Sequence, residues 1–267
     1  MTETRRYLLA AALLFAGACS QGGVEPQGTE AASESAEPTS EERLDAAIAG
    51  AWRSDQERAR DAFRNPKKTL RFFGVEPDMT VAEIWPGGGW YTNITAPYLA
   101  SGGGVYIAAG LDPALSERAA ARAEAFKETY GGKPELYGDV RLSVLGEEAD
   151  IAPTGSADAV LTFRNVHNWM GREGLTEIYF DKFFSALKPG GVLGVVEHRA
   201  DSADVDPRTG YVAEETVIAF AEAAGFEFEA RSEINANPAD TKDHPFGVWT
   251  LPPVRRSSAT RGVDDPD

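Results

Sequence analysis

The sequence has 267 residues, of which 42% are hydrophobic, enough for one full-sized domain with appendages. It carries 42 acidic and 26 basic residues, a formal net charge of −16, and its runs of lysine and arginine are never longer than a pair. Because phosphate binding needs a concentrated basic surface, we expect no nucleic-acid partner.

The N-terminus has the pattern of a secretory signal peptide. Arg5 and Arg6 precede an apolar run over 7–15, and three small residues lead to Cys19. The apolar run is too short to stay in a membrane as a spanning helix. We therefore predict a signal peptide at 1–18 and export to the periplasm.

Cys19 is the only cysteine, which excludes an intramolecular disulfide. Its position directly after the small residues resembles the lipobox of bacterial lipoproteins, which implies a lipid on Cys19 and attachment to a bacterial membrane. Ordinary cleavage is the alternative, because 16–18 also fits an A-x-A site and the lipobox usually has leucine where Ala16 stands. We favour the lipid, since a sole cysteine at this position is hard to ascribe to chance.

The next segment is polar and then becomes helical. Residues 19–42 contain little to bury, which predicts a flexible acidic tether. The globular domain is expected over 43–254, beginning with helices at 43–75 that pack on its edge, and 255–267 is expected to be a disordered tail. The polar faces of these helices carry three arginines that we expect to be solvated, Arg58, Arg60 and Arg64.

Beyond Pro77, short apolar runs alternate with longer segments of helical periodicity. We predict strands at 80–85, 104–109, 141–145, 158–163 and 191–197. We predict helices at 91–100, 113–129, 172–187 and 212–224. This alternation is typical of an α/β domain with a parallel sheet. The last two predicted strands, 226–234 and 248–251, have no helix between them, which indicates an antiparallel hairpin.

Four segments, in this order, resemble the motifs of class I S-adenosylmethionine-dependent methyltransferases over about residues 65–252. VAEIWPGGG resembles the first motif, SADAVLTFRNVHNW the fourth strand with its substrate-side loop, and FFSALKPGGVLGVVEH the helix, turn and fifth strand; the final hairpin completes the match. GGGWYT, FRNVHNW, NPAD and GVWTLPP resemble, more narrowly, a group of exported proteins described as predicted methyltransferases. The resemblance implies a Rossmann-like fold with a seven-stranded, mostly parallel sheet, an antiparallel C-terminal hairpin and helices on both faces.

The resemblance also implies a site for S-adenosylmethionine. The residues expected to hold it are Glu83, Trp85, Gly87, Gly88, Gly89 and Asp112. Glycine lets a backbone approach a ligand closely and adopts positive φ at little cost. Two departures stand out: Trp85 replaces the first glycine of the motif, and the second strand ends on alanines, so that Asp112 comes three residues after the usual ribose-binding acid. We therefore expect weaker cofactor binding than in an ordinary family member.

The three histidines form a second group of candidates. His167, His198 and His244 all follow predicted strands or lie in the last loop, so this fold would bring them toward one edge of the sheet. His167 and His198 are the catalytic candidates, as general base or acceptor-orienting group. The expected substrate contacts are Asn165, Asn168, Trp169, Glu197 and His244. Metal binding is the weaker reading, because no spacing forms a local ligand motif, and scattered structural histidines are the third.

These patterns together predict an exported, lipid-anchored S-adenosylmethionine-dependent methyltransferase that acts on a small molecule. The alternative is an envelope lipoprotein that has this fold and binds a ligand or metal without methyl transfer, since a fold can be retained after its ancestral function is lost. A different reaction on the same scaffold is a third possibility.

Overall fold

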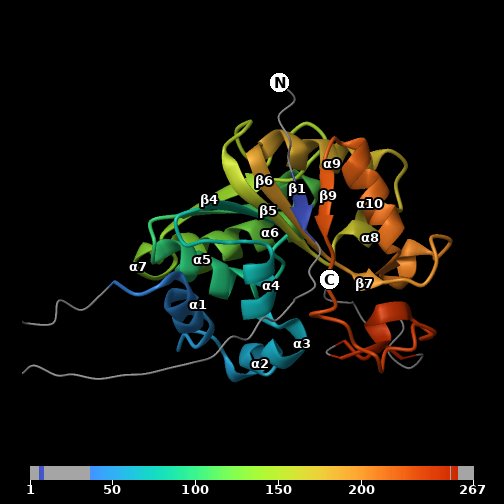
Figure 1. Ribbon diagram of the computed structural model, residues 1–267, viewed down its shortest axis with the longest axis horizontal. Coiled ribbons are helices and arrows are strands. Elements are labelled where there is room, and N and C mark those ends of the chain that lie inside the picture. Colours follow the sequence, from blue (N-terminus) through green and yellow to red (C-terminus); the bar gives the residue numbers. More distant parts are fainter. Residues whose placement is uncertain (1–5, 9–36, 253, 258–267) are drawn as a thin grey trace, which may run out of the picture.

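The computed structural model describes residues 6–8, 37–252 and 254–257 (Figure 1). Its main sheet has seven strands in the order β4-β3-β2-β5-β6-β1-β9, and the paired strands are all parallel. The strands are β1 (Arg6–Leu8), β2 (Thr80–Ile84), β3 (Val105–Gly110), β4 (Asp139–Val144), β5 (Ala157–Phe163), β6 (Leu187–Val196) and β9 (Glu227–Ala230). The predicted α/β, Rossmann-like class with a parallel sheet is thereby confirmed.

The strand order creates a switch point between β2 and β5. From β2 the chain moves outward to β3 and β4, then returns to the other side of β2 as β5. Ile84 at the end of β2 pairs with Thr162 near the end of β5. In an open parallel sheet, the crevice beyond such neighbouring carboxyl ends is where ligands bind. The candidate residues of the first motif and of the NVHNW loop lie at this edge.

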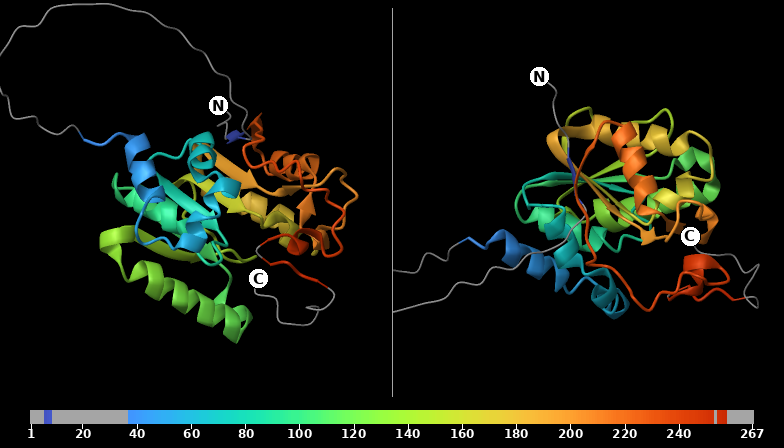
Figure 2. Two further views of the ribbon diagram at one scale, coloured as in Figure 1. Left: turned by 90° about the horizontal axis from the view of Figure 1, so that it is seen from below. Right: turned by 45° about the vertical axis from the view of Figure 1, so that its right-hand side comes forward.

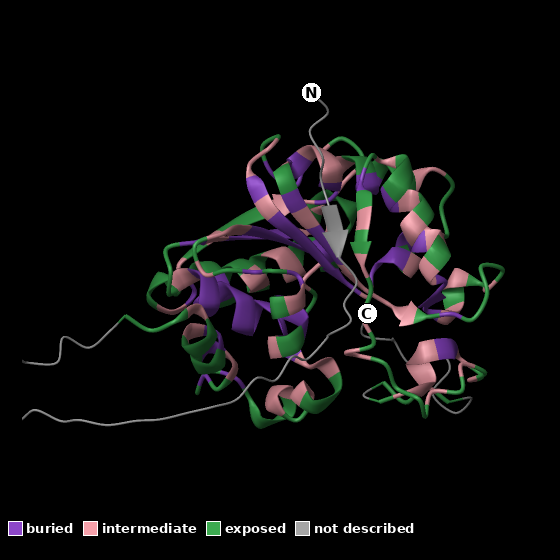
Figure 3. Cartoon of the chain, viewed as in Figure 1, coloured by how far each residue is buried: buried purple, intermediate pink, exposed green. Residues whose placement is uncertain are grey.

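Helices cover both faces of the sheet (Figure 2). On one face, residues of α1 (Ser40–Ile48), α4 (Pro66–Phe72) and α5 (Thr92–Ala100) share a core cluster with Val81 and Leu161. On the other face, α9 (Leu175–Ala186) and α10 (Glu214–Ala223) pack against Ala82 and Val160. Successive strand residues point to opposite faces, so both faces of these strands are apolar and buried (Figure 3).

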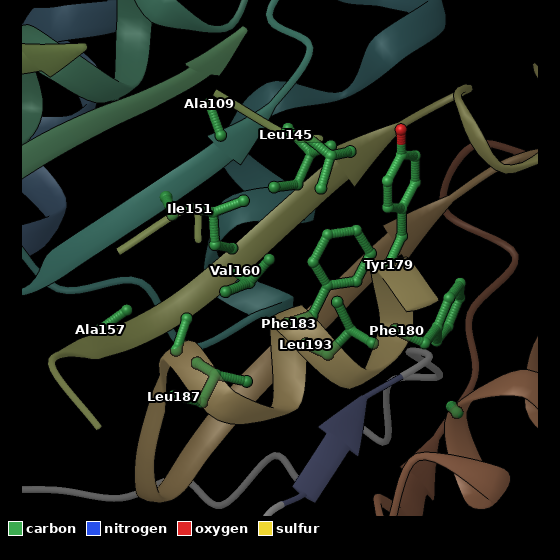
Figure 4. Close-up of a cluster of buried hydrophobic side chains, with 14 of the residues drawn as sticks. Ala109, Leu145, Ile151, Ala157, Val160, Tyr179, Phe180, Phe183, Leu187 and Leu193 are labelled. Carbon is green, nitrogen blue, oxygen red and sulfur yellow. The ribbon is translucent and has the colours of Figure 1, made fainter. Parts of the chain in front are cut away.

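The cluster beneath α9 is built from interlocking aliphatic and aromatic side chains. Leu145, Ile151, Val160 and Leu193 meet Phe183 of α9, which is fully buried (Figure 4). Burying a side chain of this size contributes about 1.5–3 kcal/mol relative to exposure. This cluster fixes the positions of β2, β5 and β6, whose ends carry the candidate site.

Shorter elements connect these layers. They are α2 (Asp55–Arg58), α3 (Asp61–Arg64), η1 (Pro113–Leu115), α6 (Glu117–Phe126), η2 (Lys127–Gly131), α7 (Pro134–Tyr137), α8 (Val166–Trp169), β7 (His198–Arg199), η3 (Pro207–Thr209), β8 (Tyr211–Val212) and η4 (Gly247–Thr250). Strands β7 and β8 form a separate two-stranded parallel sheet. None of the helices in 37–252 is long and apolar enough to cross a bilayer.

The predicted antiparallel C-terminal hairpin is wrong. Residues 247–250 form the 3₁₀ helix η4 instead of a strand, and the position between β6 and β9 belongs to β1. Val248 packs beside Tyr211 and Ala213, so its apolar surface is buried against β8 rather than against the main sheet. A short apolar run can bury itself in either way, and periodicity alone does not distinguish them.

The N-terminal boundaries also differ from expectation. Three residues of the predicted signal peptide form β1, in which Tyr7 pairs with Leu193 on one side and Phe228 on the other. The chain is helical from Ser40, inside the predicted tether, because Thr39 and Glu42 form a capping box at the start of α1. Cys19 and most of the tether lie outside the described residues.

Candidate functional site

The turn after β2 keeps the left-handed backbone of a glycine turn although tryptophan replaces its first glycine. The φ angles are 45° at Trp85, 59° at Gly87 and 79° at Gly89. Such angles are rare for bulky residues and cost an L-residue about 1–2 kcal/mol. A Cβ atom added at Gly87 or Gly88 would meet nothing within 4 Å, so open space borders this part of the turn. A ligand can therefore approach the main chain of these two residues.

The indole of Trp85 is held against the core beneath α9. Its ring centroid is 5.7 Å from that of Trp169 and 6.4 Å from that of Tyr179, both in edge-on geometry. Its Nε1 atom is buried and has no hydrogen-bond partner among the described residues. The packing thus holds Trp85 in its strained conformation, and the indole supports the turn from below.

Glu83 lies just before this turn and is nearly completely buried, with 3% exposure. Its Oε2 atom accepts a hydrogen bond of 2.6 Å from the Tyr106 hydroxyl, which is 2.8 Å from Thr92 Oγ1. Burial raises the pKa of Glu83 to about 7, against the opposing effects of the Tyr106 hydrogen bond and the Arg64 charge. Glu83 is thus a carboxyl group poised between its two protonation states near neutral pH.

Tyr130, from η2, covers the far end of the turn. Its hydroxyl lies 3.3 Å from the Gly88 carbonyl oxygen and 3.4 Å from that of Gly89, and it donates to them. A Cβ at Gly89 would lie only 1.9 Å from this hydroxyl. Close contact between a ligand and Gly89 therefore requires Tyr130 to move.

The end of β3 offers no acid beside Glu83. Ala108 pairs with Glu83 and Ala109 with Ile84, and both alanines are buried. Asp112 follows the strand and caps η1, where its Oδ1 accepts a hydrogen bond of 2.8 Å from the Ala114 amide. One carboxylate oxygen of Asp112 is therefore engaged with the main chain of the turn that it caps.

The loop after β5 is tied to both neighbouring strands. Asn165 donates hydrogen bonds of 2.9 Å to the Ile84 carbonyl and 3.3 Å to Thr162 Oγ1. Glu197 accepts from the Val166 amide at 2.6 Å, and its second oxygen lies 3.4 Å from His167 Nδ1. The side chains of His167 and Glu197 are 8% and 6% exposed. The Glu197 carboxylate thus orients the His167 imidazole.

The other expected contacts in this loop divide between core and surface. Trp169 is fully buried among Trp85, Tyr179 and Phe183, so it supports the loop from the core. Asn168 is exposed. Trp249, expected inside a strand, lies in η4 with its ring 5.7 Å from the His167 ring. Trp249 is therefore a neighbour of His167 that the sequence pattern does not reveal.

His198 lines a cavity at this edge, and His244 contacts Asp240, another lining residue. The cavity has a volume of about 500 Å³, and its lining includes Glu197, His198 and Asp240. His244 Nε2 is 2.9 Å from Asp240 Oδ1, which also accepts a hydrogen bond of 2.8 Å from the Tyr211 hydroxyl. Burial, aided by the charges of Arg164 and His167, lowers the pKa of His198 to about 4. His198 is therefore neutral at physiological pH.

The structure thus brings the three histidines to one edge of the sheet, as the fold predicts, while their roles stay predictions. His167 is paired with Glu197, and His244 is paired with Asp240. The charges of His167 and Asp240 both act on His198. Within the described part of the chain, no group of three or more potential ligand residues is arranged to hold a metal ion.

The expectation that the helix-borne arginines are solvated is wrong, because Arg58, Arg60 and Arg64 are all half-buried. Arg58 donates a hydrogen bond of 3.2 Å to the Gly50 carbonyl. The guanidinium carbon of Arg64 lies 4.5 Å from the centre of the Trp90 ring. Trp90 and Tyr91 are themselves buried, so they form a packed wall rather than an open aromatic pocket. The helical pattern indicated the polar face but not its contact with the Trp90 ring.

Comparison with known proteins adds no family assignment. No protein-family model matches this chain, and a search of curated proteins finds no match either. Among solved structures, a SAM-dependent methyltransferase from Aquifex aeolicus is 18% identical, covering 62% of this chain and 82% of that one, with a TM-score of 0.46. A putative methyltransferase from Bacillus halodurans C-125 is 17% identical over 62% and 70% of the two chains, with a TM-score of 0.46. These similarities concern the fold alone.

Proposed function

We propose that this protein is an S-adenosylmethionine-dependent methyltransferase that acts on a small molecule. The observation that supports this most is the left-handed turn after Glu83, which keeps its shape even with Trp85 in the first glycine position. Strain of this kind persists where the surrounding structure enforces it, often at functional sites.

The described residues fit the cofactor in part. The open main chain at Gly87 and Gly88 can border it, and Glu83 is the acid expected to receive its amino acid portion. The ends of β3 do not supply the usual ribose-binding acid. Each missing hydrogen bond weakens binding by about 0.5–1.5 kcal/mol. When bound, S-adenosylmethionine supplies a methyl group made electrophilic by its sulfonium.

The chain itself supplies proton removal and orientation of the acceptor. With Glu197 accepting from Nδ1–H, the His167 tautomer is fixed so that Nε2 carries the free lone pair. This nitrogen is the candidate base for an acceptor's proton. The 3.4 Å separation is long for a catalytic hydrogen bond, and such bonds often tighten when substrate binds. Neutral His198, lining the cavity, can orient the acceptor through a hydrogen bond.

The cellular setting is part of the same proposal. We infer export through the signal peptide at 1–18 and attachment to a bacterial membrane through lipid on Cys19, as in the exported predicted-methyltransferase group that the sequence resembles. The support is the charged start, the short apolar run and the position of the sole cysteine.

Calorimetric titration of the full chain with S-adenosylhomocysteine tests the cofactor site. Gly87→Val should weaken binding at least tenfold, because it fills the open space at the turn. Gly155→Val is the matched control, since Gly155 also has positive φ, 66°, and open surroundings but lies before β5. No binding at millimolar ligand, or equal effects of both variants, would contradict the cofactor site.

Transfer is tested with methyl-labelled S-adenosylmethionine and the small-molecule fraction of the producing cells. His167→Ala should abolish labelling of the acceptor while leaving S-adenosylhomocysteine affinity and the unfolding midpoint nearly unchanged. Labelling by the His167→Ala protein at the wild-type rate would exclude this histidine as the base.

A ligand-binding protein without transfer is the second candidate. Tyr130 favours it because its hydroxyl lies against Gly89 and reduces access to the cofactor recess. The absence of an acid at the end of β3 favours it too, since Ala108 and Ala109 stand there. This protein would bind a ligand in the 500 Å³ cavity and would label no acceptor under any condition.

A further inference from the structure

Three arginines come together beside the candidate site, and we call them the arginine cluster: Arg60, Arg64 and Arg164. Arg60 precedes α3 and Arg64 ends it, one helical turn apart and on the same face. Arg164 is the first residue after β5, where its amide donates to the Val196 carbonyl at 2.7 Å. Its φ of 62° is a strained value for arginine.

A stack of aromatic rings joins the two sides of this cluster. The Tyr91 hydroxyl donates a hydrogen bond of 3.2 Å to the Arg64 carbonyl. The Tyr91 ring stacks on Phe163, with centroids 3.6 Å apart and planes at 11°. Arg164 follows Phe163 directly in the chain. The stacked rings of Tyr91 and Phe163 thus connect the main chain at Arg64 to the main chain at Arg164.

None of the three side chains donates a hydrogen bond or forms an ion pair with any residue in the described ranges. The contrast is Arg53, whose guanidinium is fully buried and binds both oxygens of Asp61, at 2.9 and 2.6 Å. All three cluster arginines are half-buried, in a chain with a large excess of acids. Arg64 lies over the Trp90 ring, but among the described residues no carboxylate forms an ion pair with any of the three. Because partly buried charges without counter-charges are unfavourable, a bound anion would stabilise the cluster.

The positive charges of the cluster lower one another's pKa values. Burial, then the charges of Arg164 and Arg60, lowers the pKa of Arg64 to about 8. Burial and the charge of Arg60 also lower the pKa of Arg164. The acids that act on them are Glu57 on Arg60, Glu83 on Arg64 and Glu197 on Arg164. Burial favours the neutral form of Glu83, Glu197 is paired with His167, and Glu57 accepts hydrogen bonds from Ser54 and Asn93. These acids therefore compensate the guanidinium charges only in part, which leaves a positive field at the cluster.

The cluster adjoins the 500 Å³ cavity. Asn65, next to Arg64, donates hydrogen bonds to the Ile234 carbonyl at 2.9 Å and to Asn235 Oδ1 at 3.3 Å, and both partners line the cavity. Val196, bonded to the Arg164 amide, lines it too. A ligand in this cavity, near His198, is within reach of the positive field.

We propose that the arginine cluster binds a carboxylate or phosphate group carried by the methyl acceptor, so that the substrate is a small anion. This rests on the proposed methyl transfer, and it assigns the acceptor's chemical class. Guanidinium groups suit planar, bidentate recognition of such groups.

Inorganic phosphate is the probe, titrated calorimetrically into the full chain. Wild-type protein should bind one phosphate, and Arg64→Gln and Arg164→Gln should each weaken this binding about tenfold. Arg208→Gln is the matched control, because Arg208 is exposed and paired only with Asp206. Phosphate should also raise the unfolding midpoint of the wild type but not of the cluster variants. No phosphate binding, or equal loss in the control, would overturn the proposal.

Two further titrations identify which molecule carries the anion. Phosphate affinity should be unchanged in saturating S-adenosylhomocysteine if the cluster serves the acceptor. Displacement of phosphate, together with Arg64→Gln weakening S-adenosylhomocysteine but not 5′-methylthioadenosine, would assign the cluster to the cofactor's carboxylate and overturn the proposal. Intact phosphate binding without any S-adenosylhomocysteine binding would support the anion site and contradict methyl transfer.

Discussion

Replacing Trp85 by glycine and by alanine separates the two contributions of this residue. Both variants lose the indole that packs against Trp169 and Tyr179, so this loss cancels when they are compared. What remains is the left-handed backbone at position 85, with φ of 45°. Only glycine adopts it without steric penalty.

At position 85 the glycine variant should be more stable than the alanine variant, whereas in the interior of a helix or strand glycine is usually the less stable residue. The left-handed conformation costs alanine about 1–2 kcal/mol, whereas glycine loses about 0.5–1 kcal/mol more chain entropy on folding. Trp85→Gly should therefore be more stable than Trp85→Ala by about 1 kcal/mol, or about 2–4 °C in unfolding midpoint for a domain of this size. Both should be less stable than wild type because aromatic packing is lost.

Urea unfolding followed by circular dichroism measures this difference, with equal m-values as the condition for comparing midpoints. Ala121→Gly on exposed α6 is the control, and there glycine should be the less stable residue by about 1 kcal/mol. Trp85→Ala being the more stable of the two variants would mean that the turn relaxes to negative φ, and the argument for an enforced glycine-type turn would fail.

Four more outcomes follow from the structure. The pKa of Glu83 in the folded protein, about 7, lies above its ordinary value of 4.5. The free energy of unfolding of wild type relative to Glu83→Gln should therefore fall as pH rises from 4.5 to 7, by about 1 kcal/mol per pH unit. A difference between the two proteins that does not change with pH would refute the burial argument. The pKa of His198 in the folded protein, about 4, lies below its ordinary value of 6.5. The free energy of unfolding of wild type relative to His198→Gln should therefore fall as pH is lowered from 6.5 to 4, at a similar rate per pH unit. A difference between the urea midpoints of the two proteins that does not change with pH would contradict this. Tyr130→Ala should lower stability by about 3 kcal/mol and speed S-adenosylhomocysteine association severalfold by uncovering Gly89, and an unchanged stopped-flow rate means that the phenol is no obstacle. Cys19→Ala should release the protein from membranes or block its processing, and mass spectrometry finding wild-type protein unlipidated would refute the anchor.

Strands β2 to β6 were predictable because they are short, apolar and separated by helical or turn segments, a pattern with few alternatives, whereas β1 lies in a segment whose charged start and apolar run indicate a signal peptide. The C-terminal strand was not, because Val248 finds its apolar partners beside β8. The acid of the first motif is identifiable from the resemblance, but its partner Tyr106 is not among the predicted site residues. Tyr106 lies two residues before Ala108 and so shares its face beside Glu83, a signal that strand alternation contains.

The arginine cluster shows a different limit. Spacing indicates that Arg60 and Arg64 share a helix face, yet the contact of Arg64 with the Trp90 ring comes from a segment about 26 residues later in the chain. Arg164 stands next to the apolar strand that ends at Phe163, where sequence reasoning sees only a loop residue. Convergence of charges from distant segments requires the packing of Tyr91 on Phe163, which no local pattern encodes.

Strand β1 has a consequence for the order of events in the life of the chain. Residues 6–8 pair with β6 on one side and β9 on the other, and both of these strands lie in the C-terminal third of the chain. In the exported protein that we propose, the leader must be free and the chain unfolded to pass a translocation channel, so a precursor that folds first would hold part of its leader inside the sheet. Under that proposal the chain has to be exported before it folds, and a slow-folding variant would be exported more efficiently than a fast-folding one. Cleavage ahead of Cys19 would then remove β1 from its place between β6 and β9.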